Sequence, residues 1–100
     1  MIYIGYQITP VPGKLNELLE RIAGARKIAE SHGAKQIGGF QISIGPSTGS
    51  LFYIVGYKDA ETYRAVGKAI NDSADMKQAL ALTASSSSAA LQPLPGSPIQ

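Results

Sequence analysis

Residues 2–9 have the composition of a β-strand, with apolar or aromatic side chains at both odd-numbered and even-numbered positions. Successive side chains of a strand point to opposite faces, so Ile4 and Tyr6 share one face while Tyr3 lies on the other. Pro10 and Pro12 end the strand, because proline cannot donate to a sheet ladder. A sheet that contains such a strand needs a covering layer on each face.

Two further strands are predicted in the middle of the chain. Leu51–Tyr57 is a continuous aromatic and β-branched run, too short for a helix and bounded by turn residues, which is typical of a buried strand. Residues 35–44 predict its antiparallel neighbour, joined to it by a turn-rich stretch at residues 45–49. Gly38 and Gly39 interrupt this neighbour and indicate a bulge or a close approach of the backbone.

The helices are predicted from apolar periodicity and capping residues. Apolar residues recur at helical spacing from Leu15 to Ala29, with charged residues on the remaining arc. Gly33 follows this pattern and can take the left-handed conformation of a helix C-cap. A second helix is predicted up to Asn71 with Asp59 as its N-cap, and a short third helix over residues 74–82.

Residues 85–100 admit two interpretations. The run of serines at residues 85–88, followed by three prolines, is typical of a flexible tail. A closing strand near residues 89–94, which contains Leu91 and Leu94, would instead pair with the sheet edge that the preceding elements leave open. The second interpretation gives a ferredoxin-like β-α-β-β-α-β domain of the α+β class with an antiparallel sheet.

Composition limits the possible partners and the location. A chain of 100 residues has room for a single domain with one core, here residues 1–100. It has no cysteine, which excludes disulfides and thiolate sites and favours a cytoplasmic location. The net charge is only +2 and the basic residues are not clustered, so no nucleic-acid partner is expected. No apolar run reaches about 18 residues and no signal peptide is recognised, so no membrane segment is expected.

The sequence offers few residues for catalysis or metal binding. His32 is the only histidine, and its predicted place at a helix C-terminus, where an imidazole interacts favourably with the helix dipole, accounts for it. One histidine without cysteine is a poor ligand set, so no metal site is predicted. The glycines match no phosphate-binding loop or dinucleotide fingerprint, and the serine run lacks the nucleophile elbow of hydrolases. No cofactor is expected.

Short structural motifs along nearly the whole chain carry a family resemblance. They are Tyr3, residues 12–14 before the first helix, His32 and Gly33 after it, Gly38, Ile44 and Gly45, Tyr57, and residues 94–98. The sequence resembles the NIPSNAP-like branch of the dimeric α/β barrel superfamily. This resemblance implies a ferredoxin-like protomer whose sheet packs on its helices with one face and on a second protomer with the other. A homodimer, or a higher oligomer, is the expected assembly.

The resemblance also implies a cavity between the two sheets. It places Tyr6, Tyr53 and Tyr57 on the cavity face and Tyr3 on the helix side. Phenols on a cavity wall could hydrogen-bond a ligand, although tyrosines on strands are also ordinary packing and dimer-contact residues.

Relatives of this kind often alternate an acid, an arginine and a tyrosine in the first strand, where this chain has Ile4, Tyr6 and Ile8. Their third strand often has histidine and tryptophan where this chain has Tyr53 and Val55. We therefore expect a less polar cavity here.

Gln41 and Ser43 alternate with apolar neighbours in the second predicted strand. They either present polar groups to the barrel interior or lie at a solvent-facing edge.

Three functions remain open from the sequence. The first is binding of a small, largely apolar molecule between the sheets of a homodimer, with Tyr6, Gln41, Tyr53 and Tyr57 as ligand contacts. The second is a cofactor-independent monooxygenase that desolvates an activated aromatic substrate. The third is a structural assembly module whose interior is filled by side chains.

Overall fold

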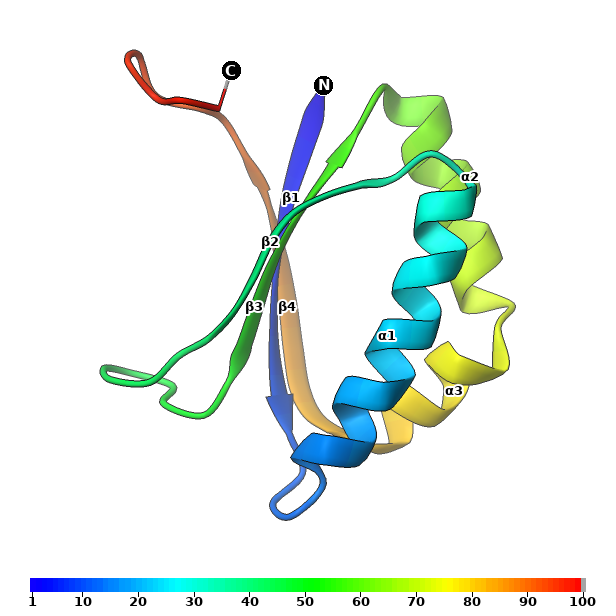
Figure 1. The fold of residues 1–100 in the computed structure, drawn as a ribbon, viewed down its shortest axis with the longest axis vertical. Coiled ribbons are helices and arrows are strands. Elements are labelled where there is room, and N and C mark those ends of the chain that lie inside the picture. Colours follow the sequence, from blue (N-terminus) through cyan, green and yellow to red (C-terminus); the bar gives the residue numbers. More distant parts are fainter. Residues whose placement is uncertain (100) are drawn as a thin grey trace.

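The structure is a computed structural model that describes residues 1–99, and it contains four strands and three helices. Their bounds are β1 Ile2–Pro10, α1 Leu15–Ser31, β2 Lys35–Gln41, β3 Leu51–Tyr57, α2 Ala60–Asn71, α3 Ala74–Ala81 and β4 Thr83–Leu91. The sheet order is β2-β3-β1-β4, and every neighbouring pair is antiparallel. This is the predicted ferredoxin-like arrangement, with the second helical segment divided into α2 and α3 (Figure 1).

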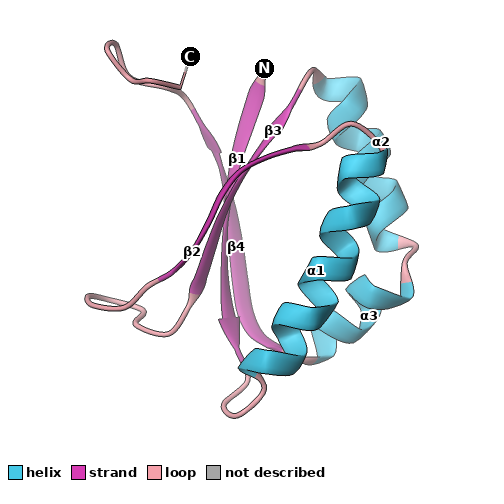
Figure 2. Cartoon of the chain, viewed as in Figure 1, coloured by secondary structure: helices cyan, strands magenta, loops and turns pink. Residues whose placement is uncertain are grey.

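All three helices lie on one face of the sheet, so the domain has two layers (Figure 2). Ile4 and Val55 are paired across β1 and β3, and both pack with Ala29 of α1 and Val66 of α2. A second cluster joins Leu18 of α1 to the strand and α3 residues Leu51 and Ala79. The apolar core therefore lies between the sheet and the helices, where the alternating residues of the strands meet the apolar faces of α1, α2 and α3.

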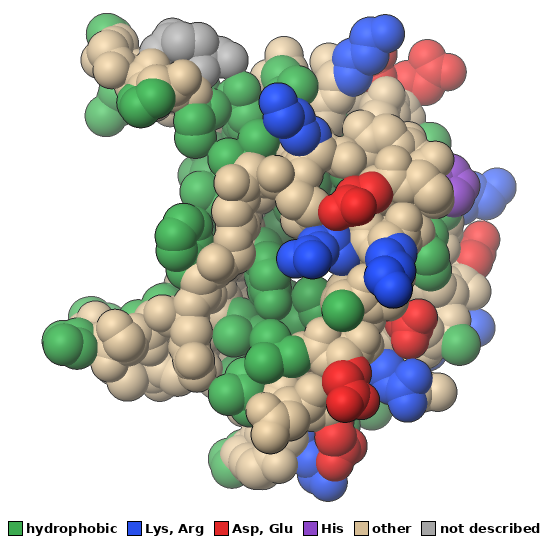
Figure 3. All heavy atoms as spheres, viewed as in Figure 1, with side chains coloured by type: hydrophobic (Ala, Val, Ile, Leu, Met, Phe, Trp, Pro, Cys, Tyr) green, Lys and Arg blue, Asp and Glu red, His purple; other side chains and the backbone are tan. Residues whose placement is uncertain are grey.

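The other face of the sheet, which we call the open face, has no helix over it. The strand registers put the following residues on it: Tyr3, Gly5, Gln7, Gly38, Phe40, Phe52, Ile54, Ser87, Ala89 and Leu91. Figure 3 shows hydrophobic side chains along this side of the molecule, whereas charged side chains gather over the helices. At one end of the open face, Pro93 and Ile99 border a small pocket with the buried ring of Tyr3.

Most predicted elements are confirmed, and their ends have clear local causes. The backbone N–H of Thr62 donates to the Asp59 carboxylate at 2.7 Å, which caps α2, and Ser73 caps α3 in the same way through Met76. Gly33 follows His32, the C-cap of α1, and its φ of +105° is the left-handed conformation that commonly ends a helix.

The second strand is shorter than predicted. β2 ends at Gln41 rather than at residue 44, because the chain leaves the sheet in a loop where Ser47 and Gly49 have positive φ. The predicted irregularity at the paired glycines is confirmed: the register with β3 shifts between Gln36 and Gly38.

The closing strand exists, but its predicted start is wrong. β4 begins at Thr83 rather than near residue 89, and the serine run forms its middle instead of a flexible tail. Ser85 to Ser88 pair with Thr9 to Tyr6 of β1, so the backbone hydrogen bonds of the β1 edge order a segment whose side chains give no periodic signal.

Candidate ligand-binding site

Two tyrosines on the central strands form a phenol pair between the sheet and the helix layer. Tyr6 lies on β1 and Tyr57 on β3, and their hydroxyl oxygens are 2.8 Å apart. Either hydroxyl can be the donor of this hydrogen bond. The ring of Tyr63 on α2 meets the ring of Tyr57 edge to face, with a centroid distance of 5.1 Å and an interplanar angle of 80°. Tyr57 is therefore fixed from both the sheet and the helix layer.

These tyrosines lie on the opposite face from the one that was expected. Tyr6 and Tyr53 are paired across β1 and β3, share the face of Ile4 and Val55, and pack against the helix-side core. Tyr3 lies on the open face with Phe52 and Ile54. The assignment of Tyr6, Tyr53 and Tyr57 to a cavity between two sheets, and of Tyr3 to the helix side, is wrong. Both faces of the first strand are apolar, so the sequence of the strand does not show which face the helices cover.

Three hollows lie around the space between the sheet and the helices, and we define them by their lining residues. The β4 cleft, of about 330 Å³, is bordered by Leu80 of α3 and by Thr83, Ser86 and Ser88 of β4. The α2 cleft, of about 650 Å³, is bordered by Tyr57, Tyr63, Arg64, Gly67 and Lys68. The inner pocket, of about 110 Å³, is bordered by Ile22, Arg26, Gln36, Tyr53 and Tyr57.

Tyr6 and Met76 line all three hollows. Tyr6 projects from the sheet and Met76 from α3, so their side chains form opposite walls of the junction. Methionine is unbranched and flexible, and it adapts to irregular gaps better than other apolar side chains. Met76 therefore supplies an adaptable wall that all three hollows share.

Burial keeps the phenols of the site in their neutral form. It raises the pKa of Tyr6 strongly, and the hydrogen bond with Tyr57 adds to that effect. Burial also raises the pKa of Tyr57, only partly offset by its bond with Tyr6, and it raises the pKa of Tyr53 against the lowering effect of the Arg26 charge. These phenols can donate and accept hydrogen bonds at neutral pH but do not supply a phenolate base.

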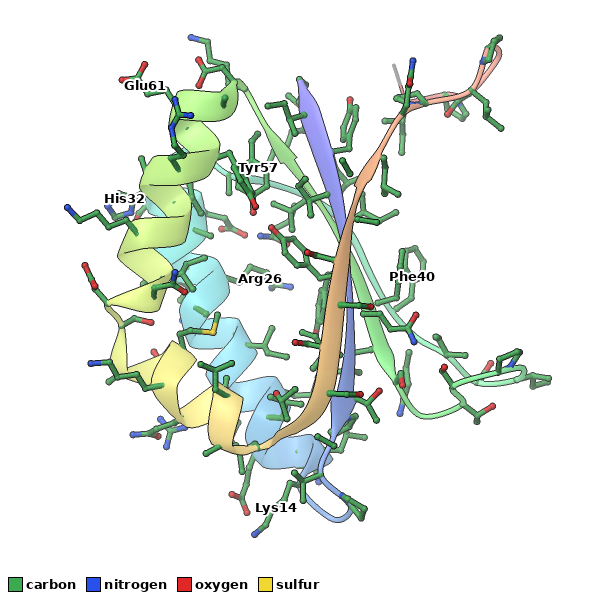
Figure 4. The ribbon with its side chains drawn as sticks, turned by 180° about the vertical axis from the view of Figure 1, so that it is seen from behind. Lys14, Arg26, His32, Phe40, Tyr57 and Glu61 are labelled. Carbon is green, nitrogen blue, oxygen red and sulfur yellow. The ribbon has the colours of Figure 1, made fainter. Side chains whose placement is uncertain are left out.

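The position of the Tyr53 ring, which lines the inner pocket, depends on a glycine of β2. A Cβ atom on Gly39 would stand 2.9 Å from the Tyr53 ring, so the missing side chain lets this ring lie against the backbone of β2. Arg26 extends from α1 into the space between the layers, beside the same pocket (Figure 4). Its Nε atom is 3.8 Å from a carboxylate oxygen of Glu30. The paired glycines thus serve the close approach that the sequence indicated.

The structure does not bring all the predicted site residues together. Gln41 is exposed and borders a separate shallow groove with Pro12 and Gly49, away from the tyrosines. His32 lies at the end of α1, where its Nδ1 atom is 3.0 Å from the carbonyl oxygen of Ile28. Among residues 1–99, no group of three or more metal-ligating side chains could hold a metal ion.

Sequence reasoning missed several residues of the site. Met76, Tyr63 and Arg64 were recognised at most as parts of amphipathic helices, since one face of a helix does not reveal which strand side chains it meets. The mid-helix position of Gly67 was the one available signal, because glycine is unfavourable there.

The two-layer fold, with its helix-covered antiparallel sheet and a hollow between the layers, defines a ferredoxin-like α+β protein. The chain belongs to the NIPSNAP family, whose sequence profile matches residues 3–98. No curated protein sequence matches the chain. No helix within the described residues is both long and apolar enough to cross a membrane.

Solved structures confirm the fold. A NIPSNAP family protein from Agrobacterium tumefaciens has a TM-score of 0.82 at 19% identity, and the alignment covers 99% of this chain and 98% of that one. A NIPSNAP domain protein from Burkholderia xenovorans has a TM-score of 0.77 at 16% identity, covering 98% and 99%. An antibiotic biosynthesis monooxygenase is similar at a TM-score of 0.64 and 12% identity, covering 95% of this chain and 100% of that chain.

Proposed function

We propose that the protein binds a small, largely apolar molecule in the hollow between its sheet and its helices. The observation that carries this proposal is the phenol pair of Tyr6 and Tyr57, set among apolar walls at the meeting point of the three hollows. Ligand sites of proteins are typically such concave, mostly apolar spaces with a few polar groups that fix orientation. The site differs from the one inferred from the sequence, because it lies within one protomer rather than between two sheets.

The phenol pair supplies one hydrogen-bond donor to a ligand. Two phenols have two O–H groups, and the mutual bond uses one of them whichever oxygen donates. The remaining O–H is free to donate to an oxygen or nitrogen of the bound molecule. We therefore propose a ligand with a carbonyl, ether or hydroxyl oxygen on an otherwise apolar body.

Homodimerisation through the open face is part of the same proposal. Phe40 is 60% exposed and Leu91 is 38% exposed on this face, although both are large apolar side chains. Contiguous apolar surface on a sheet face indicates a protein interface. A second copy that covers this face would leave the clefts accessible, because they lie on the helix side of the sheet.

The binding proposal is tested with a neutral fluorescent ketone, 6-propionyl-2-(dimethylamino)naphthalene, and with the neutral amine N-phenyl-1-naphthylamine, which lacks a carbonyl. We expect both probes to bind, but only the ketone has a carbonyl oxygen that can accept a hydrogen bond from the remaining phenol O–H. Tyr6→Phe and Tyr57→Phe each leave one O–H, so only the double variant loses the donor. Its affinity for the ketone should fall about threefold to tenfold, the effect of one hydrogen bond.

The outcomes separate the candidate functions. Equal loss of both probes in the double variant indicates a collapsed hollow and contradicts the role of the donor. A stable dimer that binds neither probe, and carries no small molecule in native mass spectrometry, supports an assembly module instead. Oxygen consumption in the presence of electron-rich phenols, abolished by the double variant, would support the monooxygenase alternative that the fold similarity raises.

A further inference from the structure

The geometry of the α2 cleft points to an anionic, amphipathic ligand whose acidic group lies between Arg64 and Lys68. This inference rests on the proposed function, since it concerns the charge of the molecule that occupies the same site. We propose that the apolar body of the ligand lies against Tyr6, Tyr57 and Met76, and that a carboxylate or a related anion lies at the cleft mouth on α2.

Gly67 is the first observation that supports this inference. It lies inside α2, where glycine costs about 1 kcal/mol relative to alanine. Its backbone does not have the positive φ that would require glycine, and a Cβ atom there would meet nothing within 4 Å. By contrast, a Cβ atom on Gly24 of α1 would collide with the carboxylate of Asp75. Packing therefore explains Gly24 but not Gly67, and Gly67 borders the α2 cleft, which its missing side chain keeps wide.

The charges around Gly67 are the second observation. Arg64 and Lys68 border the cleft three residues before and one residue after this glycine, on the same side of α2. The ion pairs within residues 1–99 are Lys14–Glu17, Arg21–Asp75 and Arg26–Glu30, so neither cation of the cleft is paired. Asp72 at the end of α2 is the one acidic residue that borders the cleft.

The shape and chemistry of the cleft suit an amphipathic molecule. Its volume of about 650 Å³ lies within the usual range of small-molecule sites, about 300–1,000 Å³. Its lining combines apolar or phenolic side chains, those of Val66, Ile70 and the tyrosines, with the two cations. Both cations are exposed and, within the described residues, neither lies in an ion pair, so an anion at the mouth of the cleft would meet both of them.

The charge preference is tested with two matched probes. N-phenyl-1-naphthylamine is neutral, and 8-anilinonaphthalene-1-sulfonate has the same aromatic body with an added sulfonate. We expect the sulfonate to bind more tightly and to weaken as salt is raised, because partly exposed charges are screened. The double variant Arg64→Gln/Lys68→Gln should lower sulfonate affinity about fivefold to tenfold and lower the affinity for the neutral probe far less.

A charge-matched control separates a local site from the overall charge of the protein. The double variant Lys27→Gln/Lys77→Gln removes the same charge from exposed positions that border none of the three hollows. It should leave the affinity of both probes unchanged. An equal loss of sulfonate binding in the control and in the cleft variant would overturn the inference.

Gly67 provides a test that does not depend on charge. Gly67→Leu places a side chain in the cleft without lowering helix propensity, and it should weaken the sulfonate at least tenfold, with a smaller loss for Gly67→Ala. Circular dichroism checks that both variants fold. If the neutral probe binds but the sulfonate binds no better, or if Gly67→Leu binds it normally, the inference fails while the proposed function stands. If neither probe binds, the proposed function itself fails.

Discussion

The carboxylate of Asp75 on α3 occupies the position where a side chain on Gly24 of α1 would stand. The same carboxylate forms an ion pair with Arg21, with Oδ1 3.4 Å from Nη1, so Asp75 contacts α1 at two residues. Because Met76 is the next residue of α3, this contact also sets the position of the wall that Met76 provides to the three hollows.

The same substitution is expected to stabilise the two helices unequally. Gly24→Ala should raise the free energy of unfolding less than Gly67→Ala does, since the added methyl group must displace the partly exposed Asp75 carboxylate and its ion pair with Arg21, which offsets part of the gain in helix propensity. Gly67→Ala should raise it by about 0.5–1 kcal/mol, because its Cβ meets open space. Urea denaturation of both variants measures the two changes. Equal gains in stability for the two variants would show that the contact of Asp75 with α1 contributes nothing.

The phenol pair should be measurable as an energetic coupling. Tyr6→Phe and Tyr57→Phe each remove the same half-buried hydrogen bond, at a cost of about 0.5–1.5 kcal/mol. The double variant should therefore cost less than the sum of the two single variants. Equilibrium unfolding of the four proteins in a double-mutant cycle gives the coupling energy. Strict additivity would mean that the two hydroxyls do not interact in solution.

The stability of the protein should fall at alkaline pH. Tyrosines of the unfolded chain lose their protons near pH 10, whereas the pKa values of Tyr6, Tyr53 and Tyr57 are raised in the folded protein. Above pH 10 the folded state therefore holds more protons than the unfolded state. The contribution of these tyrosines to the free energy of unfolding is fully present below pH 10 and is lost as the pH rises further.

Tyr6→Phe should make this decline shallower. The free energy of unfolding, measured by urea denaturation at several pH values on either side of pH 10, gives the two slopes. Identical slopes for the variant and the original protein would contradict the raised pKa of Tyr6.

The proposed dimer can be tested with two leucines of nearly equal exposure. Leu91 lies on the open face and is 38% exposed, and Leu19 lies on α1 and is 39% exposed. Leu91→Ser should weaken self-association, which light scattering over a range of concentrations would measure, while Leu19→Ser should not. A protein that stays monomeric at micromolar concentration before any substitution would remove the basis for the dimer.

Local patterns along the chain predict the order and kind of nearly all the elements. The signals that predict them are local: alternation in residues 2–9, helical periodicity after Leu15, and the capping residues Asp59 and Gly33. Local backbone preferences are enough to produce a strand or a helix from such signals. The glycines of β2 were also correctly associated with a close approach. Residues 85–88 were the exception, since their strand exists through pairing with β1 and not through any pattern of their own.

Tertiary structure alone decided which face of the sheet the helices cover, and with it the location of the site. A strand that is apolar on both faces is compatible with either arrangement, and long-range packing together with the handedness of the strand–helix–strand crossover selects one. Gly24 and Gly67 are equivalent in the sequence, as glycines within helices. Only the neighbours of each missing side chain, Asp75 at one position and an open cleft at the other, give them different roles.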